Sequence, residues 1–317
     1  MPDNGRLVSP IERLLAMQRT ALFRNLCAAD LEVFAEHGIE VVYRKGDVVQ
    51  APDRPVSSVI LTIEGDLDVT RDDGVSVRVA APGGFGGLDI FGDTSGGTSV
   101  VAATEVIALR FDGDLVLDIL EDNFAVLRAV LQLSGRTLID GIRKIQEDHD
   151  VPDVPKLPAC PCVDHRLDLV ERLVYLRRMP MFVDASLDAM TGLARACTER
   201  RFPAGYTLWR EGEPSMTVLF IVAGEIRGRM AGNPAVARYH PYGFLGGLSV
   251  LAGTDRLETA VTETPVVALS IDGNRLLDAV EDNFAMGLSI LRRLSHGIMD
   301  LQRRLWEHGD REVRVAV

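Results

Sequence analysis

The chain has 317 residues, of which 47% are hydrophobic and 25% are charged, and this length allows two domains of about 150 residues with a core each. The net charge of −12 disfavours nucleic acid as a partner, because affinity for a phosphate backbone depends on Lys and Arg. No apolar run approaches the roughly 18 residues of a membrane span, so we expect no membrane contact. The N-terminus lacks the pattern of a secretory signal, which predicts a cytoplasmic protein.

The first half of the chain reads as helices, then strands, then helices. Ser9 can cap a helix that begins at Pro10, and a second amphipathic segment spans 28–38. From 39 to 111 the sequence consists of short β-branched runs separated by Gly and Asp, which is typical of an antiparallel sandwich or barrel. Helical periodicity resumes near Asp114 and continues in an apolar stripe to Ile145.

The second half repeats each of these steps. Helices are predicted over 170–176 and 187–196, strands over 199–271, and a last helix with an apolar stripe over 288–305. Cys27 and Cys197 fall in predicted helices of the two halves, and we expect both to be buried as small hydrophobic side chains.

Short sequence landmarks recur after 159 or 160 positions, which identifies a duplicated folding unit. The segment 121–125 returns as 281–285 with the same residues, Glu-Asp-Asn-Phe-Ala. We therefore predict an α+β fold with two tandem domains, each an antiparallel β-roll with N-terminal helices and a long C-terminal helix. The expected boundaries are 1–147 for the first domain, 148–167 for a proline-rich linker, and 168–317 for the second domain.

The predicted linker has prolines at every third position from Pro152 to Pro161, which favours an extended polyproline spacer or, as an alternative, a docking segment. Cys160, Cys162 and His165 could be imagined as metal ligands, but structural zinc sites usually need four ligands at another spacing, so no metal is expected. An oxidisable thiol pair and simple exposure both remain open for the two cysteines. The long helices could pack on their own rolls, pair with each other, or form a homodimer.

At this point the pattern resembles the cyclic-nucleotide-binding domain of catabolite-activator-type regulators, kinase regulatory subunits and nucleotide-gated channels. The resemblance covers both halves and rests on paired glycine turns and glycine-rich segments: Arg44-Lys45-Gly46-Asp47 with Pro203-Ala204-Gly205-Tyr206, Ile63-Glu64-Gly65-Asp66 with Val222-Ala223-Gly224-Glu225, and 84–89 with 244–249. It implies that the last pair corresponds to the family's phosphate cassette, Phe-Gly-Glu-Leu-Ala followed by Pro-Arg-Ala-Ala-Thr. In such a cassette, amides and an Arg hold the cyclic phosphate, and a Glu accepts the ribose hydroxyl.

Both charged anchors of the cassette are altered. The Glu position is Gly87 in the first half and Gly247 in the second, whereas the Arg position is Gly96 and Arg256. Arg256 is either the surviving anchor or a surface Arg paired with the neighbouring acids Asp255 and Glu258.

The resemblance gives two sets of candidate residues. The candidate ligand-binding set of the second domain is Phe244, Leu245, Gly246, Gly247, Leu248, Ser249, Arg256 and Thr259, and the degenerate pocket of the first domain is Gly86, Gly87, Leu88, Asp89, Gly96 and Thr98. No cofactor is expected, although cAMP or cGMP in the second domain is an alternative.

The chain carries no recognisable metal, nucleophile or phosphate-loop motif, so we expect no enzymatic activity and no catalytic residues. The favoured interpretation is a non-catalytic regulatory or scaffold protein with degenerate pockets that acts through contacts with another protein. The alternative is a sensor that binds a cyclic nucleotide in its second domain only and signals to a partner protein.

Overall fold

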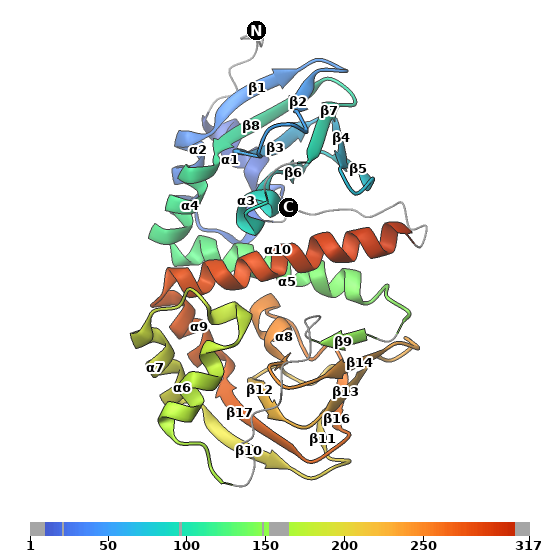
Figure 1. The fold of residues 1–317 in the computed structure, drawn as a ribbon. Coiled ribbons are helices and arrows are strands. Elements are labelled where there is room, and N and C mark those ends of the chain that lie inside the picture. Colours follow the sequence, from blue (N-terminus) through green and yellow to red (C-terminus); the bar gives the residue numbers. More distant parts are fainter. Residues whose placement is uncertain (1–9, 21, 95–96, 148, 152–164, 308–317) are drawn as a thin grey trace. The chain divides into compact units, whose positions relative to one another are not determined.

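The computed structural model describes residues 10–20, 22–94, 97–147, 149–151 and 165–307 (Figure 1). These residues form two compact units. Unit 1 contains the described residues up to Leu138 and those from Leu291 onwards, and unit 2 contains Ile139–Ile290. The units therefore divide the chain differently from the expected domain boundaries, because the second part of the last helix belongs to unit 1.

Unit 1 is built around a β-roll of two four-stranded antiparallel sheets with the strand orders β1-β8-β3-β6 and β2-β7-β4-β5. Its strands are β1 (Ile39–Tyr43), β2 (Val48–Gln50), β3 (Ser58–Glu64), β4 (Asp66–Arg71), β5 (Ser76–Ala80), β6 (Gly83–Phe85), β7 (Thr98–Ala102) and β8 (Val106–Asp112). Inward-facing residues of both sheets form one core cluster, in which Leu67, Val100 and Ala108 are fully buried. Alternate burial along short strands explains why the sequence shows a β pattern there.

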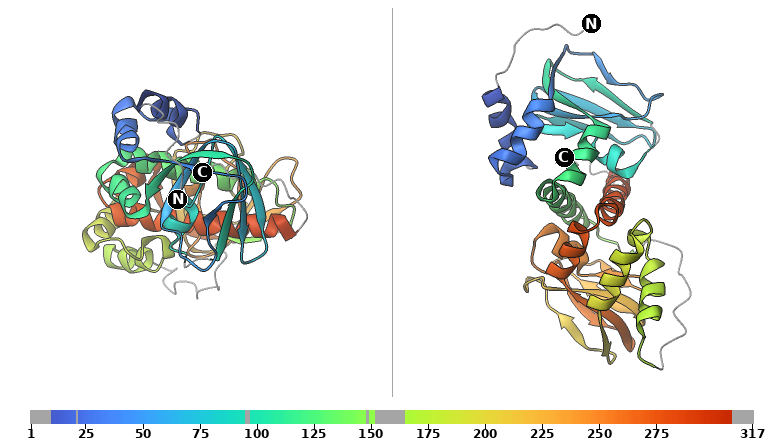
Figure 2. Two further views of the ribbon diagram at one scale, coloured as in Figure 1. Left: turned by 90° about the horizontal axis from the view of Figure 1, so that it is seen from above. Right: turned by 90° about the vertical axis from the view of Figure 1, so that its left-hand side faces the viewer.

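Helices precede, interrupt and follow this roll. They are α1 (Pro10–Gln18), the 3-10 helix η1 (Phe23–Asn25), α2 (Ala28–His37), α3 (Gly87–Gly92), α4 (Gly113–Asp122) and α5 (Phe124–Ile142). Helices α1 and α2 pack against each other beside the roll, as Figure 2 shows. Within unit 1, a Cβ at Gly297 of the last helix would lie 3.5 Å from Leu138 of α5, so the two long helices meet within this chain.

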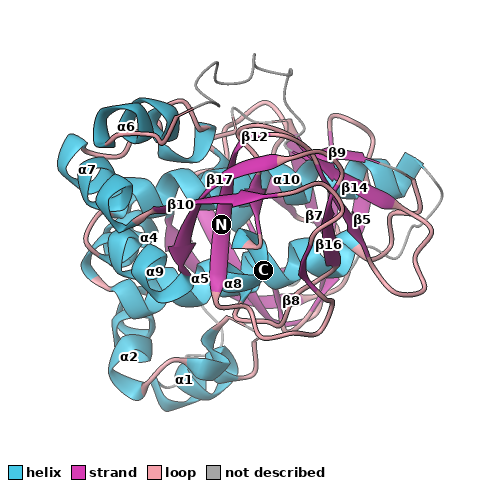
Figure 3. Ribbon diagram, turned by 90° about the horizontal axis from the view of Figure 1, so that it is seen from below, coloured by secondary structure: helices cyan, strands magenta, loops and turns pink. Residues whose placement is uncertain are grey.

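Unit 2 repeats the arrangement with sheets of the order β10-β17-β12-β15 and β11-β16-β13-β14-β9. Its strands are β9 (His149–Val151), β10 (Thr198–Phe202), β11 (Thr207–Trp209), β12 (Thr217–Ala223), β13 (Ile226–Arg229), β14 (Val236–Tyr239), β15 (Phe244–Leu245), β16 (Thr259–Thr262) and β17 (Val266–Asp272). Its helices are α6 (Leu169–Arg177), η2 (Pro180–Phe182), α7 (Leu187–Ala196), α8 (Gly247–Ala252), α9 (Gly273–Glu281) and α10 (Phe284–Glu307), of which the last runs on into unit 1. Helices α6 and α7 lie side by side (Figure 3).

Two equivalent glycines make the turn between the third and fourth strands of each roll. Gly65 and Gly224 have φ angles of 85° and 89°, a region that side chains with a Cβ rarely adopt. A Cβ at Gly65 would lie 2.1 Å from the carbonyl oxygen of Glu105, and one at Gly224 would lie 2.3 Å from that of Pro265. The recurrence of these glycines in the sequence therefore follows from backbone geometry.

The repeated Glu-Asp-Asn-Phe-Ala segment caps the long helix of each half and ties it to an earlier helix. Asn123 accepts a hydrogen bond from the amide of Val126 and donates one to Asp30 of α2. Asn283 likewise accepts from the amide of Met286 and donates to the hydroxyl of Ser186, which caps α7. The asparagine recurs because one side chain satisfies a free helix amide and fixes a tertiary contact.

The structure confirms the fold class and most predicted elements, with two differences. Residues 149–151 of the predicted linker form β9, which pairs in parallel with β14, whereas the proline repeat, Cys160 and Cys162 lie outside the described residues. Cys27 was expected to be buried in a helix, but it is the exposed residue that precedes α2, and its thiol donates to Asp30 at 3.0 Å. Cys197 is 3% exposed, as expected.

Candidate functional site

In unit 2, the glycine-rich segment 244–249 runs from β15 into α8. Gly246 has a φ of 76° and joins the two elements, Leu245 is fully buried, and Ser249 is 3% exposed. A Cβ at Gly247 would lie 1.8 Å from the ring of Phe244, which stacks on Phe220 with centroids 5.6 Å apart. An aromatic ring therefore occupies the space that a side chain at position 247 would need.

Arg256 lies inside the unit and not on its surface, although it is flanked by acids in the sequence. Its side chain is 5% exposed, and the guanidinium carbon is 3.7 Å from the centroid of the Trp209 ring. Its Nη1 is 2.2 Å from where a Cβ at Gly246 would stand, so the guanidinium adjoins the turn before α8. The alternative of a surface Arg with a local charge pair is therefore wrong.

The guanidinium of Arg256 lacks the acceptors that a buried cation normally has. Its Nε and Nη1 are buried and have no hydrogen-bond partner among the described residues. Burial lowers the pKa of Arg256 to about 10, with Glu213 opposing the shift, so the group is still charged at neutral pH. Unpaired charged donors in such a place are costly, and an anion that accepted from them would remove that cost.

Thr259, the remaining residue of the candidate set, has another task. Its hydroxyl accepts a hydrogen bond of 3.1 Å from the amide of Glu211 and so fastens the loop after β11 to the start of β16. The structure thus brings 244–249 and Arg256 together, whereas the hydroxyl of Thr259 accepts a hydrogen bond from the backbone.

Glu258 is a buried acid in the same roll, which the sequence indicates only as an acidic neighbour of Arg256. It is 6% exposed, and its Oε1 accepts a short hydrogen bond from the hydroxyl of Tyr239. Burial raises the pKa of Glu258 to about 7; the Tyr239 hydrogen bond opposes this shift, and nearby Glu211 adds to it. The sequence marks Glu258 only by its place two residues after Arg256 and just before β16.

The raised pKa of Glu258 predicts that this residue makes unit 2 less stable as the pH rises. The unfolded carboxyl ionises near its ordinary pKa of 4.5, whereas the folded one keeps its proton up to about 7. Its contribution is therefore complete below pH 4.5 and is lost between pH 4.5 and pH 7. We expect the stability of the native chain relative to Glu258→Gln to fall by about 1 to 3 kcal/mol between pH 4.5 and pH 8, measured by urea unfolding. An equal difference at both pH values would contradict the burial of an ionisable carboxyl here.

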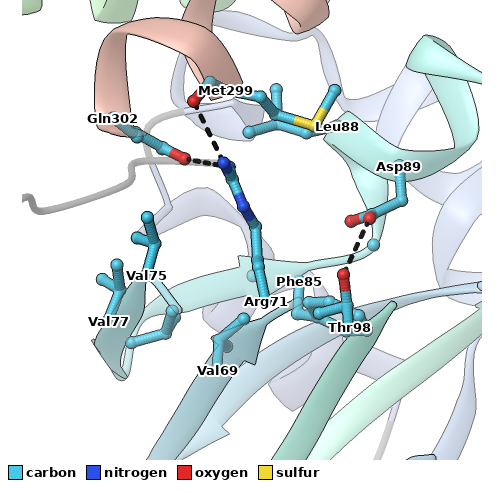
Figure 4. A pocket seen from close by; sticks show the side chains of 13 residues that line it. Val69, Arg71, Val75, Val77, Phe85, Leu88, Asp89, Thr98, Met299 and Gln302 are labelled. Atoms are coloured by element: carbon cyan, nitrogen blue, oxygen red, sulfur yellow. Dashed lines mark hydrogen bonds between the residues drawn. The ribbon is translucent and has the colours of Figure 1, made fainter. Parts of the chain in front are cut away.

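Unit 1 has a pocket at the equivalent place, and its walls are mainly apolar (Figure 4). It offers about 50 Å³ to the centres of water-sized molecules, within about 510 Å³ of atom-free space that opens to solvent. Val69, Val77, Phe85 and Leu88 line it, together with Met299 of α10. The enclosed part has room for a few waters.

The polar lining of this pocket includes a carboxyl, which carries the opposite charge to the one that a phosphate needs. Asp89 points into it and accepts hydrogen bonds of 3.2 Å from the hydroxyls of Thr94 and Thr98 (Figure 4). Burial raises the pKa of Asp89, while the two hydroxyls and Arg71 act in the opposite direction. Of the degenerate set, Gly86 precedes α3, Gly87 begins it, and Gly96 lies outside the described residues.

Arg71, a cation in the lining of this pocket, is held by other protein groups. Its guanidinium donates to Oε1 of Gln302 and to the carbonyl oxygen of Met299, each at 3.1 Å, and it forms an ion pair with Asp73. The donors of Arg71 are thus directed to protein acceptors, in contrast to those of Arg256.

Two further observations concern the described residues as a whole. No group of His, Cys, Asp and Glu within them is arranged to hold a metal ion. None of the helices they form combines the length and the apolar character needed to cross a bilayer.

Residues 199–283, within unit 2, match the family model described as cyclic nucleotide-binding domain. Unit 2 is therefore similar to a cyclic nucleotide-binding domain over these residues. Unit 1 repeats its sequence landmarks, and its two four-stranded sheets follow the same strand order as their counterparts in unit 2.

Curated relatives match about a third of the chain. A CRP-like cAMP-activated global transcriptional regulator of Mycobacterium tuberculosis is 28% identical over 124 residues, which are 38% of this chain and 55% of the relative. A cAMP-dependent protein kinase regulatory subunit of Neurospora crassa is 28% identical over 123 residues, which are 38% of this chain and 30% of the relative. The chain thus spans about half of the first relative and less than a third of the second.

Solved structures are similar over more of the chain at lower identity. One is the regulatory subunit of a cAMP-independent protein kinase A from Trypanosoma cruzi bound to guanosine. It is 16% identical with a TM-score of 0.36, and the match covers 97% of this chain and 95% of that one.

Proposed function

We propose that this protein is a non-catalytic regulatory protein in which unit 2 binds a small phosphate-bearing ligand of the cyclic-nucleotide class, while unit 1 does not. The response passes to another protein. The observation that supports this most is Arg256, a charged and 95%-buried side chain with two unpaired donors beside the turn into α8. A phosphate oxygen would supply the acceptors that the described residues do not.

The two units differ in the charge that they present at the equivalent place. Unit 2 presents the guanidinium of Arg256, whereas unit 1 presents the carboxyl of Asp89 in a mainly apolar pocket. An anion would be repelled by that carboxylate, and Arg71 already has three protein partners. These contacts support a model in which unit 2 binds the ligand and unit 1 does not.

A second candidate function is a ligand-independent docking protein with two degenerate pockets, which was the favoured interpretation of the sequence. It is supported by Phe244, whose ring fills the place of the missing Glu side chain at position 247. The two candidates differ in whether unit 2 binds a nucleotide at all.

The Trp209 indole gives a direct assay, because the guanidinium of Arg256 lies on it. The chain has two tryptophans, so Trp306→Phe leaves Trp209 as the single reporter. We expect addition of cAMP or cGMP to change its fluorescence with a dissociation constant below about 10 μM. Calorimetry then gives the affinity of each variant independently of the reporter.

In this assay Arg256→Ala should weaken binding by about a hundredfold, because it removes a charged partner of the phosphate. Arg210→Ala is the matched control: Arg210 is exposed on the same unit and should leave the affinity unchanged. Absence of binding at millimolar cAMP and cGMP would refute the sensor and favour the docking protein. Equal losses in both variants would show that Arg256 is not the anchor.

A further inference from the structure

The interior of unit 2 contains a carboxyl group for which the neighbouring strand leaves room. A Cβ at Gly228 in β13 would lie 1.9 Å from Oε2 of Glu258, so only glycine fits beside this carboxyl. Gly228 lies two residues after Ile226, a fully buried member of the roll's core cluster. The carboxyl therefore occupies a place on the inner face of β13 that a side chain would otherwise fill.

This carboxyl has spare hydrogen-bonding capacity. Among the described residues, Tyr239 is the sole donor to it, through Oε1. Above pH 7 this carboxyl is ionised, and an ionised carboxylate has about four acceptor sites and no donor, so Oε2 is then available to groups that donate. A buried carboxylate with one partner gains from further donors more than an exposed one does.

Glu258 and Arg256 share the inner face of the chain segment that leads into β16. Residues 256, 258 and 260 are buried and alternate with less buried neighbours, which places Arg256 and Glu258 on the inward side of this segment. The two groups do not neutralise each other, since the pKa of Arg256 is influenced by Glu213 and that of Glu258 by Glu211.

We propose that Glu258 determines which nucleotide unit 2 binds, by accepting hydrogen bonds from donor groups on the ligand while Arg256 holds its phosphate. This deepens the proposed function and rests on it. The edge of guanine offers an N–H and an amino group side by side, which match the two oxygens of a carboxylate. Adenine has a ring nitrogen without a hydrogen beside its amino group. This nitrogen is a hydrogen-bond acceptor, so it would be repelled by a carboxylate oxygen, which is also an acceptor.

The proposal predicts an order of affinities for the unaltered chain at pH 8, where the carboxyl is ionised. Cyclic GMP should bind at least tenfold more tightly than cyclic AMP, and cyclic IMP, which keeps the ring N–H but lacks the amino group, should lie between them. The ribose 2′-hydroxyl is the other group of the ligand that could donate a hydrogen bond to the carboxylate. Binding of 2′-deoxy-cyclic GMP, which lacks this hydroxyl, tests whether it does. If the base is the source, this analogue retains the preference over cyclic AMP. If the hydroxyl, which cyclic AMP also carries, is the source, cyclic GMP and cyclic AMP bind equally and this analogue binds more weakly than both, which overturns the role of the base.

Two variants distinguish the effect of the Glu258 carboxylate on ligand preference from that of a neighbouring acid. Glu258→Gln exchanges one carboxylate oxygen for an amino group of similar size, so it should reduce the cyclic GMP to cyclic AMP ratio to about one third or less of the native value. Asp255→Asn removes a neighbouring exposed acid and should leave this ratio unchanged. Circular dichroism and the unfolding midpoint establish that each variant is folded.

The failure of this inference can be told apart from that of the proposed function. Nucleotide binding that depends on Arg256 but has the same affinity for all four ligands overturns the role of Glu258 and leaves the sensor intact. A preference that persists in Glu258→Gln also overturns it. If no nucleotide binds at millimolar concentration, both proposals are wrong.

Discussion

Replacing Gly224 with alanine is expected to lower the free energy of unfolding of unit 2 by about 3 to 4 kcal/mol, near the upper end for a point substitution. The new methyl group meets two penalties. A residue with a Cβ at a φ of 89° costs about 1 to 2 kcal/mol. The Cβ would also lie 2.3 Å from the carbonyl oxygen of Pro265, a backbone atom that cannot rotate away.

Gly205→Ala provides the control for the conformational penalty alone. Gly205 has a φ of 78°, but no atom lies within 4 Å of where its Cβ would stand. Its substitution should therefore cost only about 1 kcal/mol. Urea unfolding followed by Trp209 fluorescence in the Trp306→Phe background reports on unit 2 in both cases. Equal losses in the two variants would mean that the contact with Pro265 relaxes at no cost.

Restoring the family's glutamate at position 247 is expected to damage unit 2 and not to improve its affinity for a nucleotide. The Cβ of Gly247→Glu would overlap the ring of Phe244, and the carboxylate would enter a buried position. Overpacking and the buried charge together should cost about 3 to 4 kcal/mol. Unfolding in urea measures this loss, and calorimetry should find no tighter binding of cyclic nucleotides.

A double-mutant cycle identifies the cause of this loss. Phe244→Ala removes the ring, so the cost of Gly247→Glu should be about 1 to 3 kcal/mol smaller in that background. Gly192→Glu is the matched control, since Gly192 is exposed in α7 with no atom within 4 Å of where its Cβ would stand, and a helix former there should not destabilise. If the cost at position 247 were the same with and without the Phe244 ring, the ring would not be what excludes a side chain.

The fold was predictable from the sequence because its signals are local. Turn glycines, alternating short strands and helical stripes report on neighbouring residues, and the duplication allowed each half to be checked against the other. The helix over 187–196 was predicted with the bounds that the structure gives to α7. The exposed thiol of Cys27 was missed because one residue separates a buried position within a helix from an exposed position at its end.

The candidate site was less predictable, because it depends on which side chains meet across the roll. The sequence indicated Arg256 but left open whether it is buried. The ring that fills the space at Gly247 and the room that Gly228 leaves for Glu258 were not visible in the spacing of residues. Which residues of β13 and β16 lie opposite each other depends on the order of the strands in the sheet and on their register. Neither can be derived from a single sequence.

The membership of α10 in both units bears on how the protein can be dissected. Met299 and Gln302, which follow unit 2 in the sequence, line the pocket of unit 1 and accept hydrogen bonds from Arg71. A fragment that stops at the end of the first repeat therefore loses one wall of its own pocket and leaves a partly buried guanidinium without two of its acceptors. Proteolysis or truncation behind the first repeat would not release an intact half, so experiments on either unit need the whole polypeptide.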